Sequence, residues 1–471
     1  MLLTKAFVRF LHRLGLAIVA PILWAAPLPV PAQGLAISCG AVGIELTLCR
    51  ASAQAWSERT GHPVRVVSTP NSATERLALY QQWLASGARD VDVYQIDVIW
   101  PGLLARHFID LRPYSGGSED EHFPAIIEND TVDGRLVALP LYADVGLLYY
   151  RRDLLERHGR PVPRTWRELG ETAAFIQTAE RIGDGEGDGE GRRLWGYVYQ
   201  AKTYEGLTCN ALEWFAGSGG GTIVDAHGRI TVANAENENI LQLVSAWTGT
   251  IAPEGVLNYA EEEVRGVFQA GQAVFMRNWP YAWALLQGAD SPVRGRVGVA
   301  LLPHGGAVDE VPAEPTVSAA PAVTSGADGQ GHRTQRPEHA PVPRSRSTLG
   351  GWQLAVSRYS RHPALAADLV RFMTSAAEQK RRAIEGGYNP TRPALYEDPE
   401  ILAAQPFIGA LRVAVAQAVA RPSRVTRGQY NRVSVAVANA VHDALSGRAS
   451  AAQALADLDA ELHRVKRRGW R

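Results

Sequence analysis

The stretch of sequence that most constrains the fold runs from Asp90 to Pro101, DVDVYQIDVIWP. It predicts a buried β-strand that ends at Asp97, followed by Trp100 and by a helix that begins at Pro101. Open α/β sheets bind ligands at the carboxyl ends of their strands, so we expect Asp97 at a crevice with Trp100 nearby. A carboxylate accepts hydrogen bonds from hydroxyls and an aromatic face covers a pyranose ring, although a strand-end Asp also serves as a helix cap or turn former.

Strands and helices alternate along the chain from Leu35 onward. Leu35–Cys39 and Val64–Val67 are predicted strands. A helix follows the first of them with Glu45 near its start, where the helix dipole by itself favours an acid. Ser72 and Glu75 predict a capping box at the start of the next helix. This order indicates an α/β fold with crossover helices.

The second half of the chain continues the pattern. Residues 137–150 predict two extended segments joined by a polar elbow, and Thr165 with Glu168 predicts a second capping box. Pro363 is expected to start a helix that ends near Gly386. The last helix carries an apolar stripe that we expect to pack in the core: Leu455, Leu458, Leu462 and Val465.

The composition excludes some classes of protein. Of 471 residues, 46% are hydrophobic and 20% charged, which indicates a globular chain of two or three domains. Lysine plus arginine equals aspartate plus glutamate at 48 each, so we expect no nucleic-acid partner. Cys39, Cys49 and Cys209 match no zinc spacing and allow at most one disulfide. We therefore expect buried thiols, no metal site and no cofactor.

Residues 1–33 predict a secretory signal peptide. A basic start precedes a short apolar run, and small residues at positions 30–32 offer a cleavage site before Gln33. The run is short and ends in prolines, which disfavours the alternative of an uncleaved membrane anchor. Cys39 lacks the context of a lipidated cysteine, so we expect a periplasmic protein without a lipid anchor.

Residues 305–347 differ in composition from the rest of the chain. This stretch has six prolines and no aromatic residue, Leu, Ile or Met. Such a segment buries too little apolar surface to offset the entropy of ordering it. We predict a disordered surface insert between two ordered strands.

Eight stretches of the chain carry a resemblance to one family. They are CGAVGIEL (39–46), DVDVYQIDVIWPG (90–102), ALPLYADVGLLYYRRDLLERHG (138–159), WGYVYQAKTYEGL (195–207), FMRNWPYAW (275–283), TLGGWQLAVS (348–357), GYNPTRPALY (387–396) and ARPSRVTRGQY (420–430). In this order they resemble the trehalose/maltose-binding proteins of ABC sugar importers, within the family 1 extracellular solute-binding proteins. The resemblance covers nearly all of the mature chain. The insert at 305–347 departs from the family, in which this connection is short.

The resemblance implies a two-lobe periplasmic-binding-protein fold of type II, with α/β lobes joined by crossover strands. Lobe I would comprise 34–142 and 296–360, and lobe II 143–295 and 361–471. The implied function is capture of an α-linked glucose disaccharide and its delivery to the membrane permease of an ABC importer. We expect a monomer that is not an enzyme.

The resemblance also implies a set of ligand-binding residues. Three acids, Glu45, Asp97 and Asp144, would accept hydroxyl protons beside Tyr142, and Arg421 would donate to sugar oxygens. Trp279 and Trp352 would stack on the rings with Tyr281 as a helper, and Gly351 would let the backbone approach the ligand. Tyr204 and Glu205 are second-rank candidates on a segment resembling a loop.

Two other functions remain open at this stage. A secreted glycoside hydrolase also needs paired carboxylates and aromatic residues, although the sequence lacks the motifs H-E-x-x-H, G-x-S-x-G and G-x-x-x-x-G-K-[ST]. A chemoreceptor-coupled sugar sensor would use the same fold. The sequence does not settle which disaccharide would bind.

Overall fold

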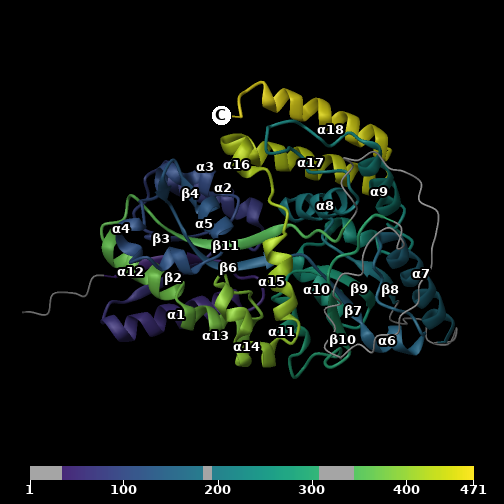
Figure 1. Cartoon of the computed structure of the whole chain (residues 1–471), viewed down its shortest axis with the longest axis horizontal. Helices are drawn as coiled ribbons and strands as arrows, with labels where there is room; N and C mark the ends of the chain where they lie inside the picture. Colours follow the sequence, from purple (N-terminus) through teal and green to yellow (C-terminus); the bar gives the residue numbers. More distant parts are fainter. Residues whose placement is uncertain (1–33, 184–193, 307–343, 471) are drawn as a thin grey trace, which may run out of the picture. The chain divides into compact units, whose positions relative to one another are not determined.

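The first of two main β-sheets has five strands in the order β2-β1-β3-β11-β6 (Figure 1). Its strands are β1 (Leu35–Cys39), β2 (Val64–Ser68), β3 (Val93–Asp97), β6 (Leu139–Val145) and β11 (Leu349–Val356). The first three strands are parallel, whereas β11 runs antiparallel to β3 and β6. On β11, Trp352 pairs with Asp97 of β3 and with Tyr142 of β6, so the register places three predicted site residues side by side.

The second sheet has four strands in the order β10-β7-β9-β8. They are β7 (Leu147–Arg151), β8 (Trp195–Val198), β9 (Ala273–Asn278) and β10 (Val297–Ala300). Gly146 alone separates β6 of the first sheet from β7 of the second, which confirms the two predicted extended segments and their elbow. Each sheet has its own hydrophobic core, and the chain therefore forms two α/β lobes.

This computed structural model describes residues 34–183, 194–306 and 344–470. The predicted signal peptide and most of the predicted insert, residues 307–343, lie outside the described residues. The ends of the predicted insert, in contrast, belong to the fold. Gly305 donates its backbone N–H to Gly217 O at 3.0 Å, and buried Ser347 donates its hydroxyl to Gly146 O at 2.7 Å. The prediction of disorder was therefore wrong for these end residues.

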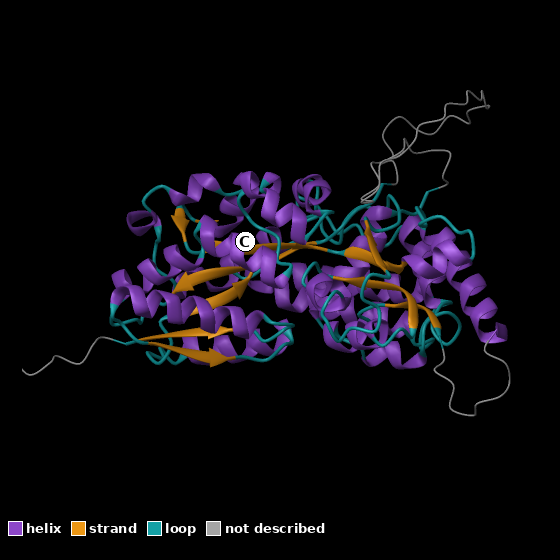
Figure 2. Cartoon of the chain, turned by 90° about the horizontal axis from the view of Figure 1, so that it is seen from below, coloured by secondary structure: helices purple, strands orange, loops and turns teal. Residues whose placement is uncertain are grey.

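Helices cover both faces of the first sheet, as Figure 2 shows. Alternate residues of β3 and β11 enter different cores, with Val93 and Leu354 on one face and Tyr94 and Ala355 on the other. The helices and the small hairpin of this part are α1 (Glu45–Thr60), α2 (Ala73–Ala85), α3 (Pro101–Leu104), α4 (Arg112–Ser115), α5 (Pro124–Asp130), β4 (Thr131–Val132), β5 (Arg135–Leu136), α12 (Pro363–Met373) and α13 (Ala376–Gly386).

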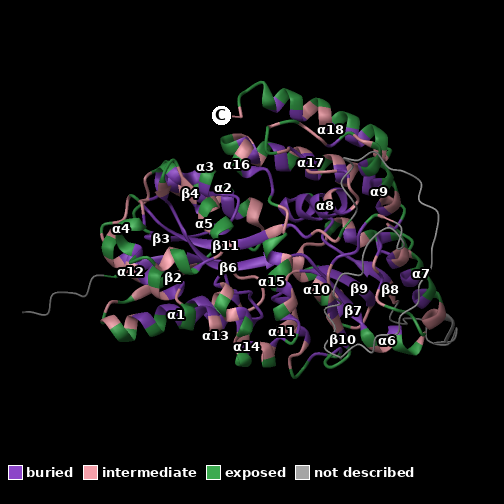
Figure 3. Cartoon of the chain, viewed as in Figure 1, coloured by how far each residue is buried: buried purple, intermediate pink, exposed green. Residues whose placement is uncertain are grey.

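The second sheet is covered in the same manner. Thr165 and Glu168 exchange hydrogen bonds of 3.2 and 3.1 Å at the start of α7, so the predicted capping box is confirmed. The remaining helices are α6 (Arg152–Arg157), α7 (Trp166–Gly183), α8 (Glu205–Gly217), α9 (Ala235–Ser245), α10 (Glu261–Gln269), α11 (Ala282–Leu286), α14 (Pro399–Ala404), α15 (Ile408–Ala416), α16 (Ser423–Thr426), α17 (Tyr430–Leu445) and α18 (Ala451–Lys466). The apolar stripe of α18 is buried, whereas its opposite side is exposed (Figure 3).

Some elements lie elsewhere than the sequence predicted. β10, assigned to lobe I within 296–360, pairs with β7 of the second sheet. The segment 363–386, assigned to lobe II, packs on the first sheet, where Leu369 lies in one core with Leu354. This segment is two helices rather than one, because Ser375 caps a new helix and accepts a hydrogen bond from the Glu378 N–H at 3.4 Å.

Candidate functional site

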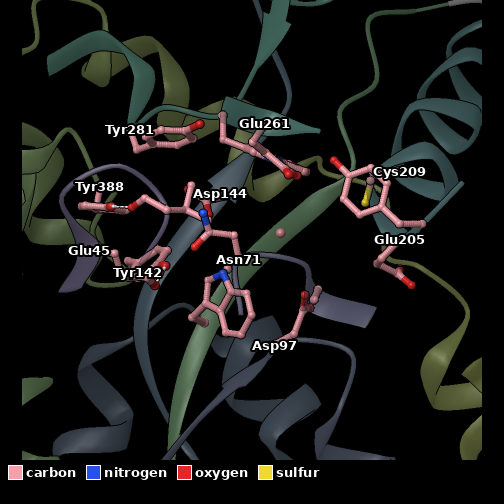
Figure 4. Close-up of a pocket in the computed structure, with 18 of the residues that line it drawn as sticks. Glu45, Asn71, Asp97, Tyr142, Asp144, Glu205, Cys209, Glu261, Tyr281 and Tyr388 are labelled. Atoms are coloured by element: carbon pink, nitrogen blue, oxygen red, sulfur yellow. Dashed lines mark hydrogen bonds between the residues drawn. The ribbon is translucent and has the colours of Figure 1, made fainter. Parts of the chain in front are cut away.

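A pocket between elements of the two sheets, which we call the central pocket, is lined by all nine predicted ligand-binding residues. Figure 4 shows five of them, Glu45, Asp97, Tyr142, Asp144 and Tyr281, among the side chains that line the pocket. The predicted residues in the lining are Glu45, Asp97, Tyr142, Asp144, Trp279, Tyr281, Gly351, Trp352 and Arg421. The lining also contains Val42, Asn71, Ala73, Tyr204, Glu205, Gly206, Cys209, Glu261, Gly350 and Tyr388.

Arg421 is enclosed between two acids on the wall of the pocket. Its two Nη atoms donate to Asp97 Oδ1 at 2.9 Å and to Glu205 Oε1 at 2.8 Å. All three side chains are buried, with 5% of Arg421, 6% of Asp97 and 8% of Glu205 exposed. Both Nη groups of Arg421 donate to protein carboxylates, whereas its buried Nε has no hydrogen-bond partner among the described residues.

The prediction that Glu205 lies on a segment resembling a loop was wrong. Glu205 is the first residue of α8, where the helix N-terminus favours an acid. Besides Arg421, its carboxylate accepts hydrogen bonds from the Tyr430 hydroxyl and from Ser434 Oγ. Burial raises the pKa of Glu205, and the Arg421 charge opposes that rise.

Glu45 is the first residue of α1 and accepts two hydrogen bonds from neighbouring side chains. The donors are the Tyr142 hydroxyl and the Gln95 amide. Gln95 is held in turn by the Gly40 N–H, which donates to its Oε1 at 2.9 Å. Burial and then the Glu45 charge raise the pKa of Tyr142, so Tyr142 stays a neutral phenol.

Asp144 lies near the end of β6 and has a different environment. Its side chain is buried, and Oδ1 has no hydrogen-bond partner among the described residues. Burial, followed by the charges of Glu45 and Asp97, raises the pKa of Asp144 to about 8. The carboxyl group is consequently protonated at neutral pH when the pocket is empty.

Trp279 and Trp352 are partly exposed in the pocket, and each lies against a buried arginine. The Arg76 guanidinium is 4.0 Å from the centre of the Trp352 ring, and that of Arg277 is 3.8 Å from the Trp279 ring. Each ring is held in place by a cation–π contact, which fixes its orientation. Trp100 was expected beside the ligand, but it is buried behind Trp352 in an edge-to-face contact and does not line the pocket.

One aromatic residue, Tyr281, and one glycine, Gly351, complete the predicted set. The Tyr281 hydroxyl donates to Glu262 Oε1 at 2.7 Å, and its ring stacks with that of Tyr388. Gly351 has a φ of 127°, and a Cβ at this position would lie 2.6 Å from Tyr142 O. Gly351 is thus required for the close approach of β11 to β6.

Sequence reasoning missed several lining residues, notably Asn71, Glu261 and Tyr388. Glu261 begins α10 in a run of three acids, which by itself indicates only a helix N-terminus. Tyr388 lies within one of the stretches that carry the family resemblance, so that motif was the available signal. Among the described residues, no group of three or more His, Cys, Asp and Glu side chains could hold a metal ion.

Two of the three cysteines differ from the prediction of buried thiols. Cys39, at the end of β1, and Cys49, in α1, form a disulfide. This bond ties the start of α1, including Glu45, to the first sheet. Cys209 is a buried free thiol, as predicted, and lines the pocket.

Removing the disulfide is expected to lower stability. The bond closes a short loop, since the two cysteines are 10 residues apart, and loop-closure entropy gives a loss of about 2–3 kcal/mol in the free energy of unfolding. Urea titration of a Cys39→Ser/Cys49→Ser variant against the oxidised parent measures this loss. Cys209→Ser serves as the control for thiol chemistry, and identical titrations for parent and double variant would contradict the prediction.

Comparison with known proteins agrees with this arrangement. A family model described as bacterial extracellular solute-binding protein matches residues 50–380. The chain is 44% identical over 464 residues to a probable ABC transporter-binding protein of Deinococcus radiodurans, covering 98% of this chain and 100% of that one. The chain therefore belongs to the bacterial extracellular solute-binding proteins.

Solved structures give the same fold. The maltose-bound MalE3 of T. maritima has a TM-score of 0.79 at 35% identity, covering 92% of this chain and 100% of that chain. An ABC transporter solute-binding protein of Agrobacterium radiobacter K84, solved with ribitol, has a TM-score of 0.74 at 19% identity and covers 93% of this chain and 100% of that one. These similarities confirm the predicted two-lobe periplasmic-binding-protein fold.

Proposed function

We propose that the protein captures an α-linked glucose disaccharide of the trehalose or maltose type in the central pocket and delivers it to an ABC importer. The observation that carries this proposal is the presence, in one buried pocket, of several carboxyl groups beside two partly exposed, rigidly held tryptophan rings. Carboxylates accept strong hydrogen bonds from hydroxyls, and the indole faces match the apolar faces of pyranose rings. The maltose-bound structure at 35% identity supports this choice of ligand class.

The remaining parts of the proposal follow from it. Residues 1–33 direct the chain to the periplasm, where it acts as a monomer that presents the filled pocket to the permease. We keep two lobes with revised boundaries, so that β10 belongs to the lobe of the second sheet and residues 363–386 belong to the lobe of the first. No helix within the described ranges is long and apolar enough to span a membrane.

Binding without chemical change is the first test. The mature protein is expected to bind trehalose or maltose in a one-to-one ratio and to leave the sugar intact. Isothermal titration calorimetry with a panel of disaccharides measures the affinity and ratio, and chromatography after long incubation detects products. Free glucose above that released by heat-inactivated protein would support a glycoside hydrolase instead.

A further inference from the structure

The central pocket contains more negative than positive side chains. Five carboxyl groups line it, from Glu45, Asp97, Asp144, Glu205 and Glu261, and Arg421 is the one cationic residue among its described lining residues. Arg421 pairs with Asp97 and Glu205. Among the described residues, the other three acids form no ion pair within 4.0 Å. Two buried arginines outside the lining lie close by: Arg76 against the Trp352 ring, and Arg277, which is paired with Glu213 and lowers the pKa of Asp144 against the effect of burial.

Asp144 is the one of these three acids with a buried oxygen that has no hydrogen-bond partner among the described residues. Glu45 accepts hydrogen bonds from Tyr142 and Gln95, and Glu261 accepts one from Trp279 Nε1 at 3.3 Å. Asp144 is more than nine-tenths buried, and its Oδ1 has no partner within the described part of the chain. A buried carboxyl group of this kind is stable as the neutral acid, or as the anion if a ligand supplies a cation.

The surroundings of Asp144 also suit a cation. Gly350 lets the β11 backbone lie close to both Asp144 and the Trp279 ring, since a Cβ there would lie 3.1 Å from Asp144 Cβ and 3.2 Å from the Trp279 ring. Figure 4 shows Asp144 among the converging side chains with Glu261 nearby, and the Glu261 charge raises the pKa of Asp144. The Arg277 contact with Trp279 shows that this ring already accepts a cation at one face.

We propose that the central pocket prefers sugars that carry an amine, and that Asp144 binds the ammonium group, with Glu261 and the Trp279 ring beside it. This inference rests on the proposed function, because it refines the class of sugar that the same pocket binds. Acidic sugars are rejected, since Arg421, the one cationic residue among the described lining residues, is already paired with two carboxylates. Neutral disaccharides bind with Asp144 as an uncharged acid, and more weakly.

Binding of an amine-bearing sugar to Asp144 should release a proton, whereas binding of a neutral sugar should not. At pH 6.5 the empty pocket holds Asp144 as the acid and the sugar amine is an ammonium ion in water. Formation of the carboxylate–ammonium pair then releases about one proton to the buffer. Titration calorimetry in buffers of different ionisation enthalpy measures this number on the parent protein, without any variant.

The affinity test compares matched ligands. The panel is trehalose and maltose, their 2-amino-2-deoxy and 6-amino-6-deoxy derivatives, and their 6-carboxylates. We expect the best amine to bind about 10- to 100-fold more tightly than its parent sugar, from a charge-assisted hydrogen bond in a buried site, and the carboxylates not to bind. In Asp144→Asn the ratio of the affinity for the amine to the affinity for its parent sugar is expected to fall to about one.

A matched variant controls for net charge. Asp290 is exposed, and Asp290→Asn makes the same chemical change outside the pocket, so the preference for the amine should persist. Melting curves check that Asp144→Asn is folded. Equal affinity for amines and parent sugars, or amine binding without proton release, would overturn this inference and leave the proposed function standing. Failure of both the parent sugars and the amines to bind would overturn the proposed function and this inference together.

Discussion

Replacing Arg421 by methionine is expected to lower the free energy of unfolding by about 3–5 kcal/mol, because the substitution leaves the Asp97 and Glu205 carboxylates buried without their cation. Methionine keeps much of the side-chain volume, so the lost stability comes from removing the positive charge rather than from creating a cavity. Urea titration followed by tryptophan fluorescence measures it. Sugar binding is expected to be lost as well, since Asp97 would no longer be held in its present orientation.

Two further variants serve as controls for the Arg421→Met result. Arg424, three residues away, pairs with Glu128 at the surface with both side chains exposed, so Arg424→Met should change stability by less than about 1 kcal/mol. Adding Glu205→Gln to Arg421→Met removes one of the two unpaired charges and should restore part of the lost stability. Equal losses in Arg421→Met and Arg424→Met would show that the buried triad contributes no more than a surface pair.

The buried triad also shows what the sequence could and could not predict. Asp97 was predicted correctly as a strand-end acid because the signal is local, a strand followed by Pro101. The family resemblance identified Arg421, but not its partners. Glu205 was placed wrongly because its burial comes from Tyr430 and Ser434, more than 200 residues further along the chain.

Similar limits explain the errors in the predicted fold. The sequence VGVA of β10 is compatible with a strand of either sheet. Its pairing with β7 depends on contacts between residues that are far apart in the sequence. The cysteines at 39 and 49 are close in sequence, but their bonding depends on how the intervening turn brings α1 back to β1. Alternation of strands and helices therefore predicted the α/β class well, whereas the assignment of elements to lobes required tertiary contacts.

Asp144→Asn is expected to stabilise the empty protein, and increasingly so as the pH rises. The pKa of Asp144 is about 8 in the folded chain and near 3.8 for an unperturbed aspartate. Between these values the folded state holds a proton that the unfolded state releases, so stability of the parent falls as pH rises from about 4 to about 8. Asparagine does not titrate, so the stability of the variant does not fall with pH in this way.

The expected gain is near zero at pH 4 and reaches about 2–5 kcal/mol at pH 8 and above, where the linkage is complete. Urea titrations of parent and variant at pH 4, 6 and 8 measure the widening difference, and exposed Asp290→Asn should show none. Parallel stability profiles would mean that Asp144 is not desolvated in the empty pocket. The sign bears on the proposed site: Asp144 is the lining acid whose Oδ1 has no hydrogen-bond partner in the described chain, so a ligand that supplies a cation or a hydrogen-bond donor would offset the cost of burying it.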